Sequence, residues 1–108
     1  MPRLLLLLPA LALAGCSAAR AHPGHPAGPA VVRVEHFRFI PARRTVRAGD
    51  AVRWQNAGVT LHAVRGRGFF SRAVAPGAAW THRFARRGVY AYVCTLHPQT
   101  MRGTIVVR

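Results

Sequence analysis

The stretch of sequence that decides the fold is VYAYVCTLHPQTMRGTIVV, residues 89–107. Its two ends are rich in β-branched and aromatic residues, which are typical of strands, and we expect strands at Val89–Cys94 and Gly103–Arg108. The loop between them carries the thiol of Cys94, the imidazole of His97 and the thioether of Met101. The stretch therefore predicts two strands joined by a loop that presents three potential metal ligands.

A fourth candidate ligand, His62, lies upstream of this loop. Two imidazoles, one thiolate and one weakly bound thioether form the ligand set of a blue copper centre. Soft sulfur favours Cu(I) and imidazole suits Cu(II), so a rigid mixed set can hold both oxidation states with little rearrangement. The sequence thus predicts one type 1 copper ion bound by His62, Cys94, His97 and Met101.

The rest of the chain from Val31 also has a β pattern, because short apolar runs alternate with turn signals and show no helical period. About seven short strands of this kind predict an all-β, antiparallel Greek-key β-sandwich. The aromatic residues Trp54, Trp80, Phe84 and Tyr92 are expected in its core, and His36 and His82 on its surface. Besides the two strands above, we expect strands at 32–40, 45–47, 51–56, 61–64 and 79–84, and a glycine-rich loop at 65–70.

The amino-terminal residues 1–15 have the features of an export signal, since one positive charge precedes an apolar run that is too short to span a bilayer. The run ends in Leu-Ala-Gly-Cys at residues 13–16, which resembles the bacterial lipobox and predicts lipidation of Cys16. Ordinary cleavage after Ala21 is the competing interpretation. In either case Cys94 is left without a disulfide partner in the mature protein, as a metal-binding thiolate requires.

Residues 16–30 are rich in Ala, Pro and Gly and predict a flexible tether between the membrane and a folded domain at 31–108. His22 and His25 lie in this tether, where they have no fixed geometry for binding copper.

The formal net charge is +14, with 16 basic and 2 acidic residues. Every basic residue is Arg, as in chains from GC-rich genomes, and export removes the protein from cytoplasmic nucleic acid. We therefore expect no nucleic-acid partner. The charge instead favours acidic redox partners and anionic lipid head groups, with rates that fall as salt rises.

Together, residues 31–108 resemble the cupredoxin family, in particular its small plastocyanin and amicyanin-like members. The resemblance rests on a histidine after the Val-x-Trp-x-Asn strand, here His62, and on the Cys-x2-His-xn-Met loop, here Cys94, His97 and Met101. It implies a monomeric one-electron carrier in the cell envelope, on the periplasmic side. It also implies that the ring edge of His97 reaches solvent and serves as the port for electrons.

The chain departs from the family pattern at two points. Three residues separate His97 from Met101, whereas amicyanins have two and plastocyanins four, and Gln99 is the alternative axial ligand because an amide oxygen can fill that weak position. The residue after His62 is Ala63, where the family has an Asn that ties the two copper loops together. Asn56 is interpreted as a turn residue, with a partial replacement of that tie as the alternative.

Two other functions compete with electron transfer. A copper carrier or storage protein of the envelope could use the same ligands together with His22 and His25, but delivery requires a more open site. A copper enzyme requires further histidines for a second centre, and the sequence has none in a suitable pattern. We therefore expect the protein not to be an enzyme.

Overall fold

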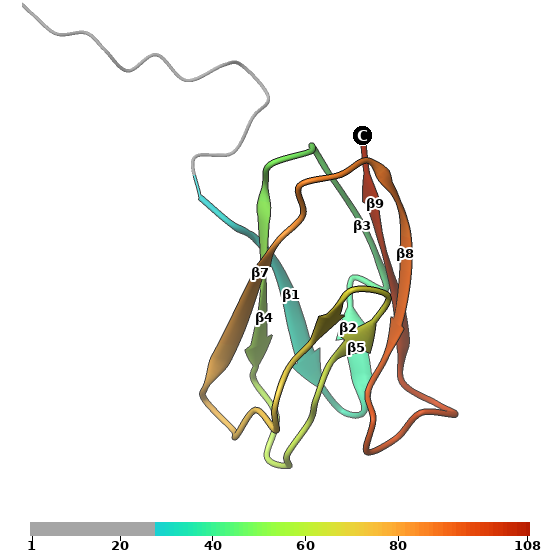
Figure 1. The fold of residues 1–108 in the computed structure, drawn as a ribbon. Helices are drawn as coiled ribbons and strands as arrows, with labels where there is room; N and C mark the ends of the chain where they lie inside the picture. Colours follow the sequence, from blue (N-terminus) through green and yellow to red (C-terminus); the bar gives the residue numbers. More distant parts are fainter. Residues whose placement is uncertain (1–27) are drawn as a thin grey trace, which may run out of the picture.

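The computed structural model describes residues 28–108, which form two β-sheets packed face to face (Figure 1). The first sheet has the strand order β2-β1-β4-β7 and the second has the order β3-β9-β8-β5-β6. The strands are β1 (Ala30–Glu35), β2 (Arg38–Ile40), β3 (Arg43–Val46), β4 (Ala51–Asn56), β5 (Arg65–Gly66), β6 (Phe69–Phe70), β7 (Ala79–Arg83), β8 (Gly88–Val93) and β9 (Arg102–Val107). This arrangement confirms the predicted all-β sandwich.

Period-two alternation produces the core, because each strand turns one set of side chains toward the opposite sheet. In β1 the buried residues are Ala30, Val32 and Val34, and in β4 they include Val52 and Trp54, as expected. Trp54 lies at the centre of the core, with its ring centroid 5.3 Å from that of Tyr92 and 5.4 Å from that of Trp80. Phe84 and Tyr92 are buried as predicted, whereas Trp80 is only half-buried.

The ring of Tyr92 in β8 lies close to Gly103, the residue opposite it in β9. A Cβ atom added at Gly103 would lie 2.3 Å from Cζ of Tyr92, so only glycine fits at this position. Burial raises the pKa of Tyr92 to about 12.

Two strand pairs are parallel, which the alternation pattern does not reveal. β1 pairs in parallel with β4, and β3 pairs in parallel with β9. The segment from β1 to β3 therefore begins in one sheet and ends at the edge of the other, after a cis peptide between Ile40 and Pro41. Both sheets are mixed rather than purely antiparallel.

The predicted single strand at 32–40 is wrong, because a tight turn divides it into β1 and β2. Glu35 pairs with Arg38, so His36 and Phe37 form a two-residue connection. Both residues have positive φ values, 51° and 58°, as in the type I′ turn that suits a β-hairpin. Asn-Gly is the usual sequence of such a turn, and its absence explains why the sequence did not predict the hairpin.

The region between β4 and β7 also differs from the prediction. The expected strand at 61–64 is reduced to a single bridge between His62 and Val74, and the expected loop at 65–70 contains the short hairpin of β5 and β6. Gly66 allows this hairpin, because a Cβ atom there would lie 2.4 Å from the ring of Phe69.

Within residues 28–108, no helix has the length and apolar character needed to cross a membrane.

Several predictions concern residues outside the described range. They are the export signal, the lipid on Cys16, the cleavage after Ala21 and the tether histidines His22 and His25. β1 begins at Ala30, the last residue assigned to the tether.

Candidate metal centre

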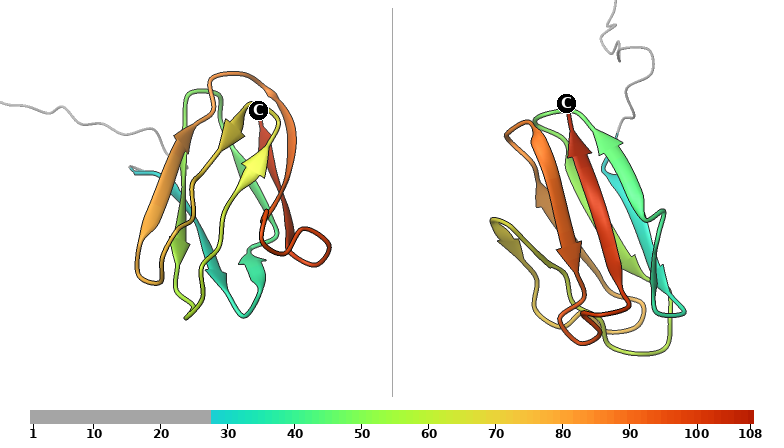
Figure 2. Two further views of the ribbon diagram at one scale, coloured as in Figure 1. Left: turned by 60° about the horizontal axis from the view of Figure 1, so that its bottom comes forward. Right: turned by 90° about the vertical axis from the view of Figure 1, so that its right-hand side faces the viewer.

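Three connecting segments meet at one end of the sandwich (Figures 1 and 2). They are the loop between β8 and β9, which carries Cys94, His97 and Met101, the segment after β4, which carries His62, and the β1–β2 turn. The predicted ligands thus come from loops that the two sheets place side by side.

Cys94 is fully buried and follows the end of β8 directly. Its sulfur accepts a hydrogen bond from the backbone N–H of Ala63 at 3.3 Å. This bond links the two ligand-bearing segments without the Asn side chain that the family pattern places after the first histidine. Cys94 forms no disulfide within the described residues.

His62 is 3% exposed, and its Nδ1 lies 3.9 Å from Sγ of Cys94. Its other nitrogen, Nε2, lies 3.1 Å from Oγ1 of Thr60. In the tautomer that carries its proton on Nε2, this N–H donates to Thr60 and the lone pair of Nδ1 faces the sulfur. Burial, and secondarily the charge of His97, lower the pKa of His62, which favours the neutral ring that a metal needs.

Asn56 makes three side-chain hydrogen bonds to the chain around His62. Its Nδ2 donates to the carbonyl oxygens of Thr60 and Val74, both at 2.8 Å, and its Oδ1 accepts from Gly58 N–H at 3.0 Å. Val74 in turn pairs with the backbone of His62. The bond of Asn56 to Gly58 N–H, two residues on, is that of the turn residue predicted from the sequence, and its bonds to Thr60 and Val74 come in addition. Its bonds do not reach the Cys94 loop, so it does not replace the missing tie between the two loops.

The loop between β8 and β9 is closed by backbone hydrogen bonds among the predicted ligands themselves. Cys94 N–H donates to the Met101 carbonyl at 3.1 Å, His97 N–H to the Cys94 carbonyl at 3.0 Å, and Met101 N–H to the His97 carbonyl at 2.9 Å. Met101 is fully buried, whereas Gln99 is exposed. The loop thus turns its thioether inward and its amide outward.

His97 is half-buried, and its ring centroid lies 5.7 Å from that of His62. Two imidazoles that bind one ion at about 2 Å place their ring centres about 5 Å apart, so this spacing is close to that of a shared metal. Within residues 28–108, however, no three His, Cys, Asp or Glu side chains are close enough together to form a complete metal site. The structure brings His62 and Cys94 into contact and leaves the His97 ring slightly apart from them.

The donor set fits copper. It offers a buried sulfur that accepts a hydrogen bond from a backbone amide, and an imidazole whose Nδ1 faces that sulfur. A second imidazole lies nearby, and a thioether is buried. These are the soft and borderline ligands that select copper among the common metals.

Two residues that contact the site were not predicted from the sequence. Thr60 has no signal beyond its position two residues before His62, and Phe37 was assigned to a continuous strand. The Phe37 ring meets the ring of His97 edge to face at 5.0 Å and that of His62 at 5.9 Å.

Of the remaining histidines of the described region, His82 lies in β7, away from the ligand-bearing loops, whereas His36 lies in the β1–β2 turn at this end. His36 is exposed, as predicted. His82 is half-buried rather than on the surface, and its ring stacks on Phe69 at 5.2 Å. Burial lowers the pKa of His82.

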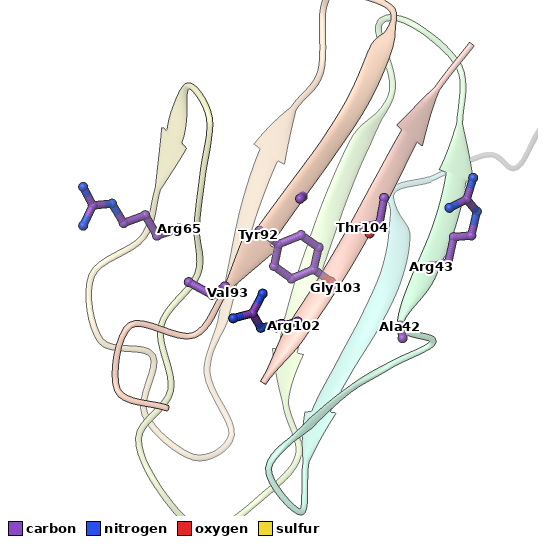
Figure 3. A pocket seen from close by; sticks show the side chains of 9 residues that line it. Ala42, Arg43, Arg65, Tyr92, Val93, Arg102, Gly103 and Thr104 are labelled. Carbon is purple, nitrogen blue, oxygen red and sulfur yellow. The ribbon is translucent and has the colours of Figure 1, made fainter. Parts of the chain in front are cut away.

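A basic groove lies beside the site, on the outer face of the five-stranded sheet. Figure 3 shows Arg43, Arg65 and Arg102 around small residues such as Gly103 and Thr104. The groove has a volume of about 460 Å³, and no acidic residue lines it. One end of the groove adjoins the loop between β8 and β9, which we call the ligand loop. Arg102 follows Met101, and Arg65 pairs with Val93, the residue before Cys94.

Comparisons with known proteins agree with the fold and with the donor set. The family model of copper binding proteins of the plastocyanin/azurin family matches residues 29–108. Amicyanin of Paracoccus versutus is 32% identical over 89 residues, covering 76% of this chain and 67% of that protein. Amicyanin-alpha of Methylorubrum extorquens is also 32% identical over 89 residues, covering 76% of this chain and 74% of that protein.

Solved structures give the same result. A reduced amicyanin variant superposes with a TM-score of 0.72 at 27% identity, over 79% of this chain and 87% of that one. A purple cupredoxin from Nitrosopumilus maritimus superposes with a TM-score of 0.69 at 22% identity, over 73% of this chain and 99% of that one, which supports the fold alone. This chain therefore belongs to the plastocyanin/azurin family of copper-binding proteins, the cupredoxins, and its cofactor is one copper ion.

Proposed function

We propose that His62, Cys94, His97 and Met101 bind the copper ion and that the protein carries single electrons between redox partners. The observation that carries this proposal is the buried contact between Nδ1 of His62 and Sγ of Cys94 at 3.9 Å. A thiolate and an imidazole nitrogen that share one ion lie at about this separation when each bond is about 2 Å long. Copper bound there supplies a one-electron Cu(I)/Cu(II) couple.

The rigidity of the site favours electron transfer over delivery of the metal. Backbone hydrogen bonds close the loop of Cys94, His97 and Met101 on itself, and Asn56 fixes the segment of His62. Two of the ligands, Cys94 and Met101, are fully buried. A site held in this way changes little when the oxidation state changes, whereas a carrier must open to release its ion.

Met101 is the axial ligand in this proposal. Its side chain is fully buried, and its backbone forms hydrogen bonds with the backbones of both Cys94 and His97. Gln99 is exposed, so its amide has to turn inward before it can reach the same ion.

The docking surface in this proposal surrounds His97. Leu61 and Leu96 are 49% and 50% exposed, and they offer apolar contact close to the ligands. The basic groove beside the loop offers attraction to an acidic partner, since no acidic residue lines it. We assign the protein a carrier role rather than an enzymatic one, because such docking requires no substrate pocket.

The same proposal places the protein in the bacterial envelope, exported and anchored by lipid on Cys16. It is supported by the sequence of residues 1–16 alone, which lie outside the described region.

The proposed ligands can be tested by loading the protein with Cu(II) and recording its visible and paramagnetic resonance spectra. We expect one copper ion per chain and an intense blue band that arises from the bond between Cu(II) and the Cys94 thiolate. Cys94→Ser and His62→Gln should both lose this band. His82→Gln removes a histidine outside the site and should keep it. A blue Cys94→Ser variant would contradict the assignment of the thiolate.

A further inference from the structure

The turn between β1 and β2 has a backbone that its residues do not favour. His36 and Phe37 have φ values of 51° and 58°, in the left-handed region. Glycine and asparagine normally occupy these positions in a two-residue hairpin, and a bulky aromatic residue is rare there. Replacing Phe37 with Gly would remove this conformational cost.

Burial does not explain why a phenylalanine stands at this position. Phe37 is 49% exposed, so much of the free energy that a buried aromatic residue contributes is absent. Residues held in sparsely populated backbone regions tend to occur at functional sites, where their neighbours fix them. We therefore look to the contacts of the Phe37 ring for the reason that this residue occupies the turn.

The Phe37 ring contacts both imidazoles of the candidate site. It meets His97 at 5.0 Å with an interplanar angle of 81°, and His62 at 5.9 Å with an angle of 77°. Both are edge-to-face arrangements of the kind that aromatic rings prefer. Phe37 belongs to neither ligand-bearing segment, so it links the two from a third element.

His97 depends on this contact more than His62 does. The ring of His62 is fixed by Thr60 through Nε2 and is buried. Among the described residues, the ring of His97 has no side-chain hydrogen bond, and its ring contacts are with Phe37 and His62. A histidine ligand is normally oriented by a partner outside the metal's own shell.

We propose that Phe37 is a positioning residue that holds the imidazole of His97 in the orientation needed to bind copper. The strained turn is what places the ring there. This inference rests on the proposed function only in assigning His97 as a ligand.

Three variants distinguish the effect of the Phe37 ring from the effect of the turn backbone. Phe37→Gly relieves the left-handed backbone and removes the ring, and Phe37→Leu keeps apolar bulk without the ring. His36→Gly is the matched control, because it relieves the neighbouring left-handed residue of the same turn and leaves Phe37 in place.

The first measurement uses the copper-free protein. The relaxation of the C–H bonds in the His97 ring is recorded by nuclear magnetic resonance, together with the thermal midpoint of unfolding. Relaxation is chosen over chemical shift because loss of the Phe37 ring current shifts the His97 signals whatever its role. We expect greater motion of the His97 ring in both Phe37 variants, although the midpoint of Phe37→Gly is retained or raised. His36→Gly should leave the His97 ring as rigid as in the parent protein.

The second measurement is the rate at which a chelator removes Cu(II), followed by loss of the blue band. We expect about a tenfold increase in both Phe37 variants and none in His36→Gly. The proposal fails if both Phe37 variants match His36→Gly in ring motion and in copper loss. It also fails if His36→Gly loosens the His97 ring, since the turn backbone is then the cause. If the parent protein binds no copper, the proposed function fails, and the copper-free measurement still decides the role of Phe37.

Discussion

Three of the four candidate ligands each contact a neighbour that is not itself a candidate ligand. The amide of Ala63 donates to the sulfur of Cys94, the hydroxyl of Thr60 meets Nε2 of His62, and the Phe37 ring faces His97. Orientation at this site is therefore a property of residues that do not bind the metal themselves.

The axial position can be tested by Met101→Gln, which replaces a thioether with a harder amide oxygen. We expect the blue colour to remain and the reduction potential to fall, because oxygen stabilises Cu(II) relative to Cu(I). Since Met101 is fully buried, the copper-free variant should also lose on the order of 1–3 kcal/mol of unfolding free energy, the cost of burying an amide without a partner. Voltammetry and denaturant unfolding measure the two effects.

Gln99→Ala is the control for this prediction, because Gln99 is exposed. It should leave the potential and the stability close to those of the parent protein. If Gln99→Ala shifts the potential and Met101→Gln does not, Gln99 is the axial ligand.

At the scale of single elements, β7 shows how an edge strand closes the core. Its inward residues are Trp80 and His82, and both stack on Phe69 from β6 of the other sheet, at 6.4 and 5.2 Å. The short hairpin of β5 and β6 thus covers the aromatic core on the side where β7 ends the first sheet.

This packing makes the stability of the copper-free protein depend on pH through His82. Burial lowers the pKa of His82 in the folded state below its ordinary value of 6.5. Above pH 6.5 both states carry a neutral ring, and as the pH falls below this value the unfolded chain binds a proton more readily than the folded one. We expect the free energy of unfolding to fall as the pH drops below 6.5, and to fall less steeply in His82→Phe. Denaturant unfolding at a series of pH values measures how steeply the free energy of unfolding depends on pH in the parent protein and in His82→Phe.

Trp80→Phe is the matched control, because it alters the same aromatic stack without removing a titratable group. It should lower the free energy of unfolding similarly at every pH. An unchanged slope in His82→Phe would assign the pH dependence to other groups, including His62, whose pKa is also lowered by burial.

For the whole molecule, the dominant physical feature is positive charge. The two acidic residues offset little of it, because the chain has 16 arginines. Glu35 pairs with Arg33, and the carboxylate of Asp50 accepts the Arg47 backbone N–H. The basic groove lies next to the ligand loop, whereas Arg47, Arg86 and Arg87 lie in connections at the opposite end (Figure 1). Net charge and local charge can therefore be separated by substitution.

Two triple variants make this separation. Replacing Arg43, Arg65 and Arg102 with Glu changes the net charge by the same amount as replacing Arg47, Arg86 and Arg87 with Glu. We expect oxidation by hexacyanoferrate(III), a multiply charged anion, to slow at least several-fold more in the first variant at low salt. The difference should disappear at high ionic strength, where attraction is screened. Equal rates in the two variants would mean that the net charge alone, and not the basic groove, sets the rate of oxidation.

The proposed lipid anchor on Cys16 can be tested on the whole protein. Cys16→Ala should release the protein from membranes or block its maturation, because stable anchoring requires lipid chains that this variant cannot receive. Fractionation and mass analysis of the amino terminus measure the outcome. A native protein that begins at His22 without lipid would instead establish cleavage after Ala21.

The sequence by itself determined the type of fold and the identity of the candidate ligands. Alternation in residues 51–56 and 89–107 assigns side chains to an inner and an outer face, and this is enough to predict a sandwich with Trp54 and Tyr92 inside. The loop from Cys94 to Met101 is local in sequence, so its ligand types could be read directly. The lipid anchor and the tether are predictions that the described residues do not test.

Only the tertiary structure decided which segments meet. The pairing of β1 with β4 and of β3 with β9 joins distant segments, and a local pattern contains no information about such partners. The approach of His62 to Cys94 and the bonds of Asn56 depend on the same long-range packing. The turn at His36 and Phe37 is the clearest case, because its residues disfavour the backbone they adopt, and contacts made after folding are what hold the Phe37 ring beside the two histidines.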